Sequence, residues 1–345
     1  MKISNLEIGQ NSKPFVIAEM SGNHNQSIDR ALKIVDAAAD AGAHAIKLQT
    51  YTADTMTIKG AYTITDKNSL WHGKELHDLY KLAYTPWEWH QEIFRHANQR
   101  GLIAFSSPFD STAVDFLEEL NVPLYKIASF ENTDHPLLKK VAKTGKPVIM
   151  STGVSTLADI FDSVQVLRQN GCKELVLLKC TSTYPATPEN TNLLTIPVLQ
   201  QIFPDCLIGL SDHTMGVGAS VASVALGARV IEKHFTLRRS DGGVDSAFSL
   251  EPEEFKSLVI ESERAFLALG QTNFSILDVE MNSKKFKRSI YVAEDVKAGE
   301  LFTKANLKVI RPGDGLEPRF YENLLGLPSK KDLQKGTPLH LKDIM

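Results

Sequence analysis

Eight short apolar segments alternate with helical segments through roughly the first 270 residues, and this alternation is the strongest constraint on the fold. Strands that alternate with helices pair in parallel through right-handed crossovers. Eight such units are typical of a (β/α)8 TIM barrel, an α/β fold. An open doubly wound sheet is the competitor, but it needs a glycine-rich turn after its first strand, and Ser21-Gly-Asn-His24 is not of that type. The predicted strands cover residues 15–18, 45–49, 102–105, 123–127, 147–150, 175–178, 207–209 and 229–232.

A change of composition after residue 275 predicts a second domain. Residues 276–287 form a polar, basic linker, and residues 288–345 are rich in Gly, Pro and Lys. Asp295-Val-Lys-Ala-Gly299 and Asp332-Leu-Gln-Lys-Gly336 repeat one pattern, which indicates a compact, pseudo-symmetric, β-rich fold. We therefore expect a catalytic barrel at residues 1–275 and a small β-rich domain at residues 288–345.

Composition excludes several classes of partner. The net charge of −3 over 345 residues gives no basis for binding nucleic acid or an anionic membrane surface. No apolar run approaches the roughly 18 residues of a membrane span, and the first ten residues lack the basic and apolar regions of a signal peptide. Three cysteines without metal or redox spacing indicate a reducing cytoplasm.

Polar groups follow almost every predicted strand. In a barrel of this type the active site lies at the carboxyl ends of the strands. Lys47 and Lys126 lie within apolar strands, where an unpaired ammonium is costly. A structural ion pair would explain either lysine, but two lysines with a ring of hydroxyls favour a cradle for a phosphate and a carboxylate. The strand-end groups are Glu19, Lys47, Gln49, Ser106, Ser107, Lys126, Ser129, Glu131, Ser151, Thr152, Thr181, Ser182, Tyr184, Ser211, Asp212, His213, Glu232 and His234. A long polar loop is expected from residue 50 to residue 75.

Two histidines follow two consecutive strands that are joined by one helix. His213 and His234 then emerge at the same end of neighbouring parallel strands, close enough to share a metal ion. With no cysteine beside them, a closed structural zinc site is not expected. Imidazoles near carboxylates suit Mn²⁺, Fe²⁺, Co²⁺ or Zn²⁺, and two protein ligands leave positions for water and substrate. A phosphate-bearing anion beside such an ion indicates carbon–carbon bond formation. The nearby carboxylates are Glu19, Asp212, Glu232 and Asp245.

Six ordered motifs resemble the sialic acid synthase family, whose members condense phosphoenolpyruvate with an N-acetylated sugar. The region that contains Val309-Ile-Arg-Pro-Gly313 resembles the antifreeze-like (SAF) domain of the same family. The resemblance covers nearly the whole chain and implies a TIM barrel followed by a C-terminal SAF domain. The six motifs are Ile17-Ala-Glu-Met-Ser-Gly-Asn-His-Asn25, Ile46-Lys-Leu-Gln-Thr50, Tyr125-Lys-Ile-Ala-Ser129, Ser151-Thr-Gly153, Gly209-Leu-Ser-Asp-His213 and Ile231-Glu-Lys-His-Phe235.

The resemblance also implies a role for each site residue. His213 and His234 would ligate a divalent ion, Mn²⁺ foremost, with Mg²⁺ or Co²⁺ as alternatives. Either Glu19 or Glu131 would move the proton. The predicted catalytic residues are Glu19, Glu131, Lys47 and Lys126. The residues expected to bind phosphoenolpyruvate are Lys47, Ser107, Lys126, Ser129, Ser151, Ser182 and Ser211. The residues expected to contact the sugar are Glu19, Gln49, Glu131, Tyr184, Asp245 and, from the partner subunit of a domain-swapped homodimer, Arg311.

Four segments favour one branch of the family, whose sugar is a 2,4-diacetamido-2,4,6-trideoxy-altrose. They are residues 69–73 around Trp71, residues 180–185, residues 244–250 and residues 311–316. Ser182 stands where N-acetylneuraminate synthases often have Asn. Synthases of N-acetylneuraminate and legionaminic acid, with the same chemistry on another sugar, are the alternatives. More distant alternatives are a metal-dependent pyruvate aldolase, which would release no phosphate, and a binding protein without activity.

Overall fold

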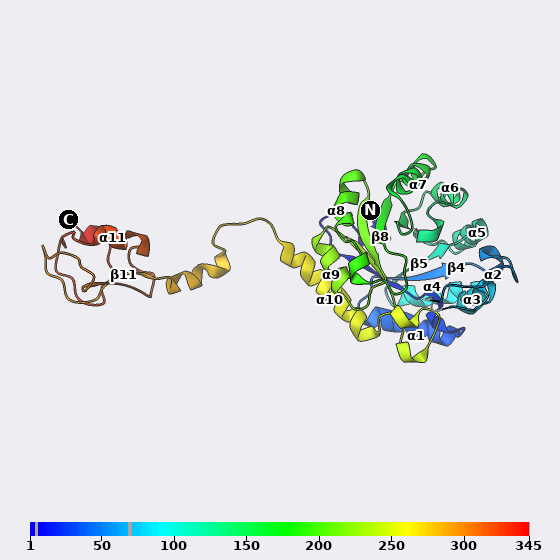
Figure 1. Ribbon diagram of the computed structural model, residues 1–345, viewed down its shortest axis with the longest axis horizontal. Helices are drawn as coiled ribbons and strands as arrows, with labels where there is room; N and C mark the ends of the chain where they lie inside the picture. Colours follow the sequence, from blue (N-terminus) through cyan, green and yellow to red (C-terminus); the bar gives the residue numbers. More distant parts are fainter. Residues whose placement is uncertain (4–5, 68–70, 345) are drawn as a thin grey trace. The chain divides into compact units, whose positions relative to one another are not determined.

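The chain divides into two compact units, Met1–Gly270 and Gln271–Met345 (Figure 1). The computed structural model describes residues 1–3, 6–67 and 71–344, so the segment 69–73 that bears on the sugar lies partly outside the described residues. Each unit encloses apolar side chains of its own. Within the described ranges no helix has both the length and the apolar character needed to cross a membrane.

The first unit contains a closed barrel of eight parallel strands, which confirms the predicted (β/α)8 fold. Consecutive strands are neighbours, and β10 pairs with β3 to close the ring, with His234 opposite Glu19. Every predicted strand is present, and most extend further toward the carboxyl end than predicted. The strands are β3 (Phe15–Glu19), β4 (Ala45–Thr50), β5 (Ile103–Pro108), β6 (Tyr125–Ile127), β7 (Val148–Ser151), β8 (Leu175–Cys180), β9 (Leu207–Asp212) and β10 (Val230–His234).

Helices surround the barrel, and polar side chains cap several of them. The Asp110 side chain accepts hydrogen bonds from two backbone amides at the start of α5, and Thr156 caps α7 in the same way. The helices that follow the strands are α1 (Ile28–Asp40), α4 (Trp87–Gln99), α5 (Ser111–Glu119), α6 (His135–Lys143), α7 (Leu157–Gln169), α8 (Thr195–Ile202), α9 (Gly218–Ala225) and α10 (Pro252–Leu269).

The connection between β4 and β5 contains two helices that were not predicted. They are α2 (Ala53–Met56), which lies within the predicted polar loop of residues 50–75, and α3 (Leu76–Ala83), which follows that loop in a stretch for which no element was predicted. Thr52 caps α2, and α3 buries Leu79 and Ala83. Helices of four and eight residues give too few turns for their periodicity to stand out from a polar loop.

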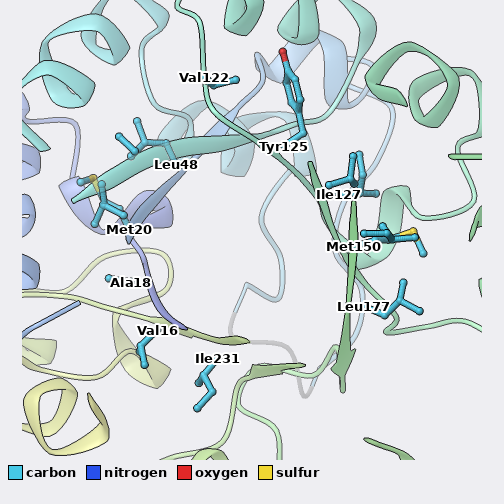
Figure 2. Packing of buried hydrophobic residues seen from close by; sticks show 14 of the residues in the cluster. Val16, Ala18, Met20, Leu48, Val122, Tyr125, Ile127, Met150, Leu177 and Ile231 are labelled. Carbon is cyan, nitrogen blue, oxygen red and sulfur yellow. The ribbon is translucent and has the colours of Figure 1, made fainter. Parts of the chain in front are cut away.

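Alternate residues of each strand pack in opposite directions, as the two-residue period of a strand requires. Val16, Ala18 and Ile231 belong to the cluster between strands and helices, and Figure 2 shows its side chains pointing away from the middle of the ring. Phe15 and Ile17 belong instead to the cluster inside the barrel. Each strand therefore has one face toward the helices and one toward the interior.

A short N-terminal hairpin closes the amino-terminal end of the barrel. It consists of β1 (Lys2–Ile3) and β2 (Leu6–Glu7), which pair in an antiparallel fashion and were not predicted. Ile3 and Ile8 are 1% exposed and pack in the interior cluster, which also contains Phe15 and Val230 at the starts of their strands. The interior is therefore filled with apolar side chains below the strand ends.

The second unit has the β-rich character that the sequence predicted. It contains an antiparallel pair, β11 (Ser289–Val292) and β12 (Leu307–Ile310), the 3-10 helices η6 (Asp278–Phe286), η7 (Pro318–Phe320) and η8 (Leu341–Asp343), and the short helix α11 (Tyr321–Leu324). The two sequence repeats face each other. Val296 and Leu333 exchange backbone hydrogen bonds of 2.9 and 2.8 Å. The side chains of Asp295 and Asp332 each accept a hydrogen bond from a backbone amide of the other copy. The repeat thus corresponds to a local pseudo-two-fold arrangement.

Gly209 lies where β9 and β10 approach too closely for a side chain. A Cβ at this position would lie 2.2 Å from the Val230 carbonyl oxygen and 2.6 Å from a methyl carbon of Leu178. We therefore expect Gly209→Ala to lower the free energy of unfolding by about 1–3 kcal/mol, measured by urea denaturation. Gly218→Ala is the control, because nothing lies within 4 Å of its added Cβ and it begins a helix. Equal midpoints for both variants would contradict this account.

Candidate active site

The alternation of the strands brings the predicted site residues together at the carboxyl end of the barrel. Glu19 follows Ile17 by two residues and Lys47 follows Ala45 by two, so both continue the interior face of their strands. The same spacing applies in the other strands. The groups that it places at this mouth are Glu19, Lys47, Gln49, Ser107, Lys126, Ser151, Ser211, His213, Glu232 and His234.

Two lysines and two glutamates form a buried charge cluster at the centre of the mouth. Glu232 lies 3.2 Å from Lys126 Nζ and 3.7 Å from Lys47 Nζ, and Lys47 also contacts the carboxylate of Glu19. All four residues are at most 5% exposed. Burial opposes ionisation of Glu232, but Lys126 and Lys47 outweigh it and lower its pKa to about 2. The ion pairs considered for the lysines are thus present, and their shared partner is Glu232, which the sequence indicated only as a carboxylate near the histidines.

Glu19, which belongs to this cluster, and Glu131, which does not, differ in the number of contacts that hold their carboxylates. Glu19 contacts Lys47 and accepts a 3.2 Å hydrogen bond from Gln49. Glu131 ends the 3-10 turn η2 (Ser129–Glu131) after β6, and its buried Oε2 has no hydrogen-bond partner among the described residues. Burial raises the pKa of each to about 7, with Lys47 opposing this for Glu19 and Lys126 for Glu131. Glu131 therefore combines a pKa near neutrality with an unused oxygen.

A group of serine hydroxyls converges on Gly153, just after β7. The amide of Gly153 donates a 3.2 Å hydrogen bond to Ser129 Oγ. A Cβ on Gly153 would lie 2.2 Å from Ser182 Oγ and 2.7 Å from Ser129 Oγ, so only glycine fits. Ser151 Oγ is buried without a hydrogen-bond partner in the described part of the chain. Small hydroxyls and a backbone amide in one place suit the oxygens of an anion.

The two histidines lie side by side, with their ring centroids 5.3 Å apart. His213 Nδ1 lies 3.1 Å from the carbonyl oxygen of Thr181, which fixes the ring and leaves Nε2 available for another contact. His234 Nδ1 is buried and lacks a hydrogen-bond partner within the described residues. The pair therefore offers ring nitrogens that the protein itself does not satisfy.

Protonation differs between the two rings. Burial lowers the pKa of His234 well below its usual range, which keeps it neutral as a metal ligand must be. Burial acts the same way on His213, but hydrogen bonds to Cys180 and Thr181 outweigh it and raise the pKa of this ring. Among the described residues no group of three or more His, Cys, Asp or Glu forms a complete metal cluster. A divalent ion held by this pair would keep several open positions.

A cavity of about 390 Å³ lies at the mouth of the barrel, beside His234 and Glu131. Tyr184 forms part of its wall and lies against His213, with ring centroids 4.5 Å apart. Asp245 accepts a hydrogen bond from Ser21, a contact that the sequence analysis missed because no motif marks it. Of the predicted sugar contacts, Gln49, Glu131, Tyr184 and Asp245 line the cavity, together with Ser182 and His234.

Two predicted positions differ from the rest. Asp212 was expected beside the histidines, but it points to the helix side of β9 and pairs with Lys233 at 2.8 Å, with both side chains fully buried. That expectation was wrong because Asp212 is one residue out of phase with His213 along the strand. Arg311 is exposed, immediately after β12, and belongs to the second unit.

Comparisons with known proteins agree with this geometry. Residues 34–274 match the NeuB family and residues 287–345 match the SAF domain, which confirms the predicted resemblance. The chain is 43% identical to pseudaminic acid synthase of Campylobacter jejuni over 99% of both chains. It is 36% identical to N,N'-diacetyllegionaminic acid synthase of the same species, over 94% of this chain and 98% of that one. The structure resembles that of N-acetylneuraminic acid synthetase from Leptospira borgpetersenii, with a TM-score of 0.73 and 32% identity, over 82% of this chain and 94% of that one.

The Asp212–Lys233 pair behind the site provides a test of its structural role. Asp212→Asn leaves the Lys233 ammonium buried without a counter-ion, so we expect the free energy of unfolding to fall by about 3–5 kcal/mol. Urea denaturation measures this directly. Asp115→Asn is the matched control in the same unit, since it breaks an exposed 2.6 Å pair with Lys140 and should leave the midpoint unchanged. A midpoint for Asp212→Asn equal to that of the control would disprove the assignment.

Proposed function

The chain belongs to the NeuB family, and on that premise we propose that it is a pseudaminic acid synthase. Such an enzyme is a transferase that condenses phosphoenolpyruvate with 2,4-diacetamido-2,4,6-trideoxy-β-L-altropyranose and water to give pseudaminic acid and phosphate. The observation that carries the proposal is 43% identity to a pseudaminic acid synthase along the full chain. The identity is lower, 36%, to a synthase of diacetyllegionaminic acid. Synthesis of legionaminic or N-acetylneuraminic acid is the alternative.

Phosphoenolpyruvate would bind deep in the barrel mouth. Its phosphate and carboxylate need cations and hydrogen-bond donors, which the two lysines and the hydroxyls around Gly153 supply. Each of the two lysines is already paired with a carboxylate, so the lysines alone do not balance the charge of a multiply charged anion. A further cation near them would favour its binding. We assign this binding to Lys47, Ser107, Lys126, Ser129, Ser151, Ser182 and Ser211.

We assign a divalent metal ion to His213 and His234. The free ring nitrogens and the open coordination positions fit such an ion. The resemblance to the family favours Mn²⁺, with Mg²⁺ or Co²⁺ as alternatives. When bound, it supplies a Lewis acid for the aldehyde oxygen of the open-chain sugar. His234 lies in the wall of the cavity assigned to the sugar, which supports this placement.

The condensation needs one proton delivered and one removed. A bond forms between C3 of phosphoenolpyruvate and the aldehyde carbon of the sugar, whose oxygen takes up a proton. Water then adds at C2 and loses one proton, which leaves a hydroxyl there. The C2–O bond to phosphate breaks as this hydroxyl becomes the C2 carbonyl, and the leaving phosphate takes the electron pair and the hydroxyl proton. We assign both transfers to Glu131, because its Oε2 is unpaired and its pKa is about 7. Glu19, held by Lys47 and Gln49, orients the charge cluster.

We also propose a cytoplasmic, domain-swapped homodimer in which residues 276–287 link the barrel to the SAF domain. In it, Arg311 of each chain would reach the sugar site of the partner subunit. Apolar side chains at this linker support a partner surface, since Phe274, just before it, is 99% exposed and Val279, within it, is 84% exposed. The three cysteines are free and buried, which suits a reducing compartment.

Phosphate release tests the proposed reaction. We expect release from phosphoenolpyruvate in the presence of Mn²⁺ with the diacetamido-trideoxy-altrose, and none with N-acetylmannosamine or the legionaminic acid precursor. Chelation of the ion should abolish release, and its return should restore it. Release with another of these sugars alone would retain the chemistry and replace the substrate, whereas consumption of pyruvate without phosphate release would favour the aldolase.

The proton-transfer assignment predicts different results for the two glutamates. Glu131→Gln should lower kcat by about 10²–10⁴-fold, whereas Glu19→Gln should keep measurable turnover. The reaction begins with protonated Glu131, so kcat of the unaltered enzyme should fall as pH rises through about 7. That decline should be absent from the residual activity of Glu131→Gln. An inactive Glu19→Gln beside an active Glu131→Gln would reverse the assignment, and unfolding midpoints would check that both variants are folded.

A further inference from the structure

The cavity above the charge cluster has two kinds of wall. Its polar lining comes from the strand ends and the loops that follow them, and includes Gln49, Glu131 and Asp245. Its apolar lining comes largely from the connection between β4 and β5, which carries α2 and α3. We call this apolar lining the α2–α3 wall, and it consists of Met56, Ile64, Leu76, Leu79 and Tyr80.

Nothing in the chemistry proposed above uses the α2–α3 wall. Condensation needs the lysines, the hydroxyls, the histidines and Glu131, all of which lie on the barrel strands or directly after them. A free sugar is coated with hydroxyls, and a wall of this composition would leave them without hydrogen-bond partners. An apolar wall in a sugar site therefore needs an explanation in the substrate.

The α2–α3 wall is held in place by polar contacts at its base. His77 Nε2 lies 3.0 Å from Asp54 Oδ1, which ties α3 to α2. The backbone of Ile64 donates to the Lys74 carbonyl at 3.0 Å and accepts from Gly73 at 2.8 Å. These contacts hold α2, α3 and Ile64 in place, so that the side chains of the wall are positioned before a ligand arrives.

A further contact joins the connection to the loop after β10. Trp71 Nε1 donates a 3.3 Å hydrogen bond to the carbonyl of Val244, next to Asp245 in the polar lining. The indole ring also lies 6.3 Å from that of Tyr184. Across the base of the cavity, Tyr51 packs edge-on against Tyr80, with ring centroids 5.7 Å apart. The polar and apolar walls are thus parts of one continuous enclosure.

We propose that the α2–α3 wall selects the sugar by packing against the methyl group at its C6 position and the methyl of its 4-acetamido group. This inference rests on the proposed function. The altrose derivative carries three methyl groups, whereas N-acetylmannosamine carries one methyl and a hydroxymethyl at C6. A hydroxyl at C6 would lose its water against Ile64 and Met56 and gain no hydrogen bond. The wall therefore favours a 6-deoxy sugar.

The degree to which an apolar pocket discriminates between two substrates can be expressed as a ratio of their kcat/KM values. Adding or removing one methylene or one hydroxyl in an apolar pocket changes kcat/KM by about 10- to 200-fold. The wall is therefore expected to shift the choice of sugar by a factor within this range, with no direct part in the reaction. Its effect should fall on kcat/KM for the sugar and leave the KM for phosphoenolpyruvate unaltered.

The test compares Ile64→Asn and Met56→Gln with Ile58→Asn in the full-length, metal-loaded protein. Ile58 lies in the same connection but is 71% exposed and does not line the cavity, so Ile58→Asn makes the same chemical change outside the wall. Phosphate release is measured with the diacetamido-trideoxy-altrose and with its 6-hydroxy counterpart. Unfolding midpoints confirm that each variant is folded.

We expect the unaltered enzyme and Ile58→Asn to prefer the 6-deoxy sugar by at least about tenfold in kcat/KM. In Ile64→Asn and Met56→Gln this ratio should fall at least about fivefold, with the KM for phosphoenolpyruvate within about twofold of its original value. Unchanged ratios in both wall variants, or an equal change in Ile58→Asn, would overturn the inference and leave the proposed function intact. No phosphate release by the unaltered enzyme with either sugar would overturn both.

Discussion

The buried carboxylate of Glu232, shared between Lys126 and Lys47, is the interaction on which the site depends. Two ammonium groups buried in a barrel interior repel each other and have lost their hydration. Without a counter-ion, nothing would offset these two costs. Removing either charge from such a pair costs several kcal/mol, so the cluster can keep its ionised form only as a unit. The hydroxyls and histidines therefore surround a group of charges whose positions are fixed by their mutual ion pairs. An incoming anion meets cations that are already positioned, which lowers the reorganisation needed in the reaction.

The same strands carry a second, purely structural set of charges on their opposite face. Glu232 and His234 point into the mouth, whereas Lys233 between them points toward the helices and pairs with Asp212. The period of two separates these roles without any additional element. A burst of polar residues at a strand end therefore mixes groups for chemistry with groups that hold the strands in register, and the phase of the strand decides which is which.

Much of the first unit follows from the sequence because its signals are local. Eight apolar runs with intervening helices fix the barrel, and strand ends fix where its polar groups gather. What the sequence does not display is pairing across the interior. The role of Glu232 becomes visible only when Lys47 and Lys126 are placed on either side of it, and Asp212 is misplaced when the phase of its strand is ignored. The N-terminal hairpin and the helices α2 and α3 were missed because two-residue strands and short helices take their stability from packing against the barrel.

The barrel strands, which the sequence predicts well, and the connection between β4 and β5, which it predicts poorly, also contribute different groups to the site. The strands supply a nearly complete reaction centre whose geometry is set by the closure of the barrel, and a change there would alter the chemistry itself. The connection between β4 and β5 contributes apolar surface to the same cavity but none of the charged cluster. It is joined to the barrel at both ends and braced by Trp71 against the loop that holds Asp245. Under the proposed role of the α2–α3 wall, substitutions on the inner surface of this connection would change which sugar is enclosed while Glu232 and its lysines keep their positions.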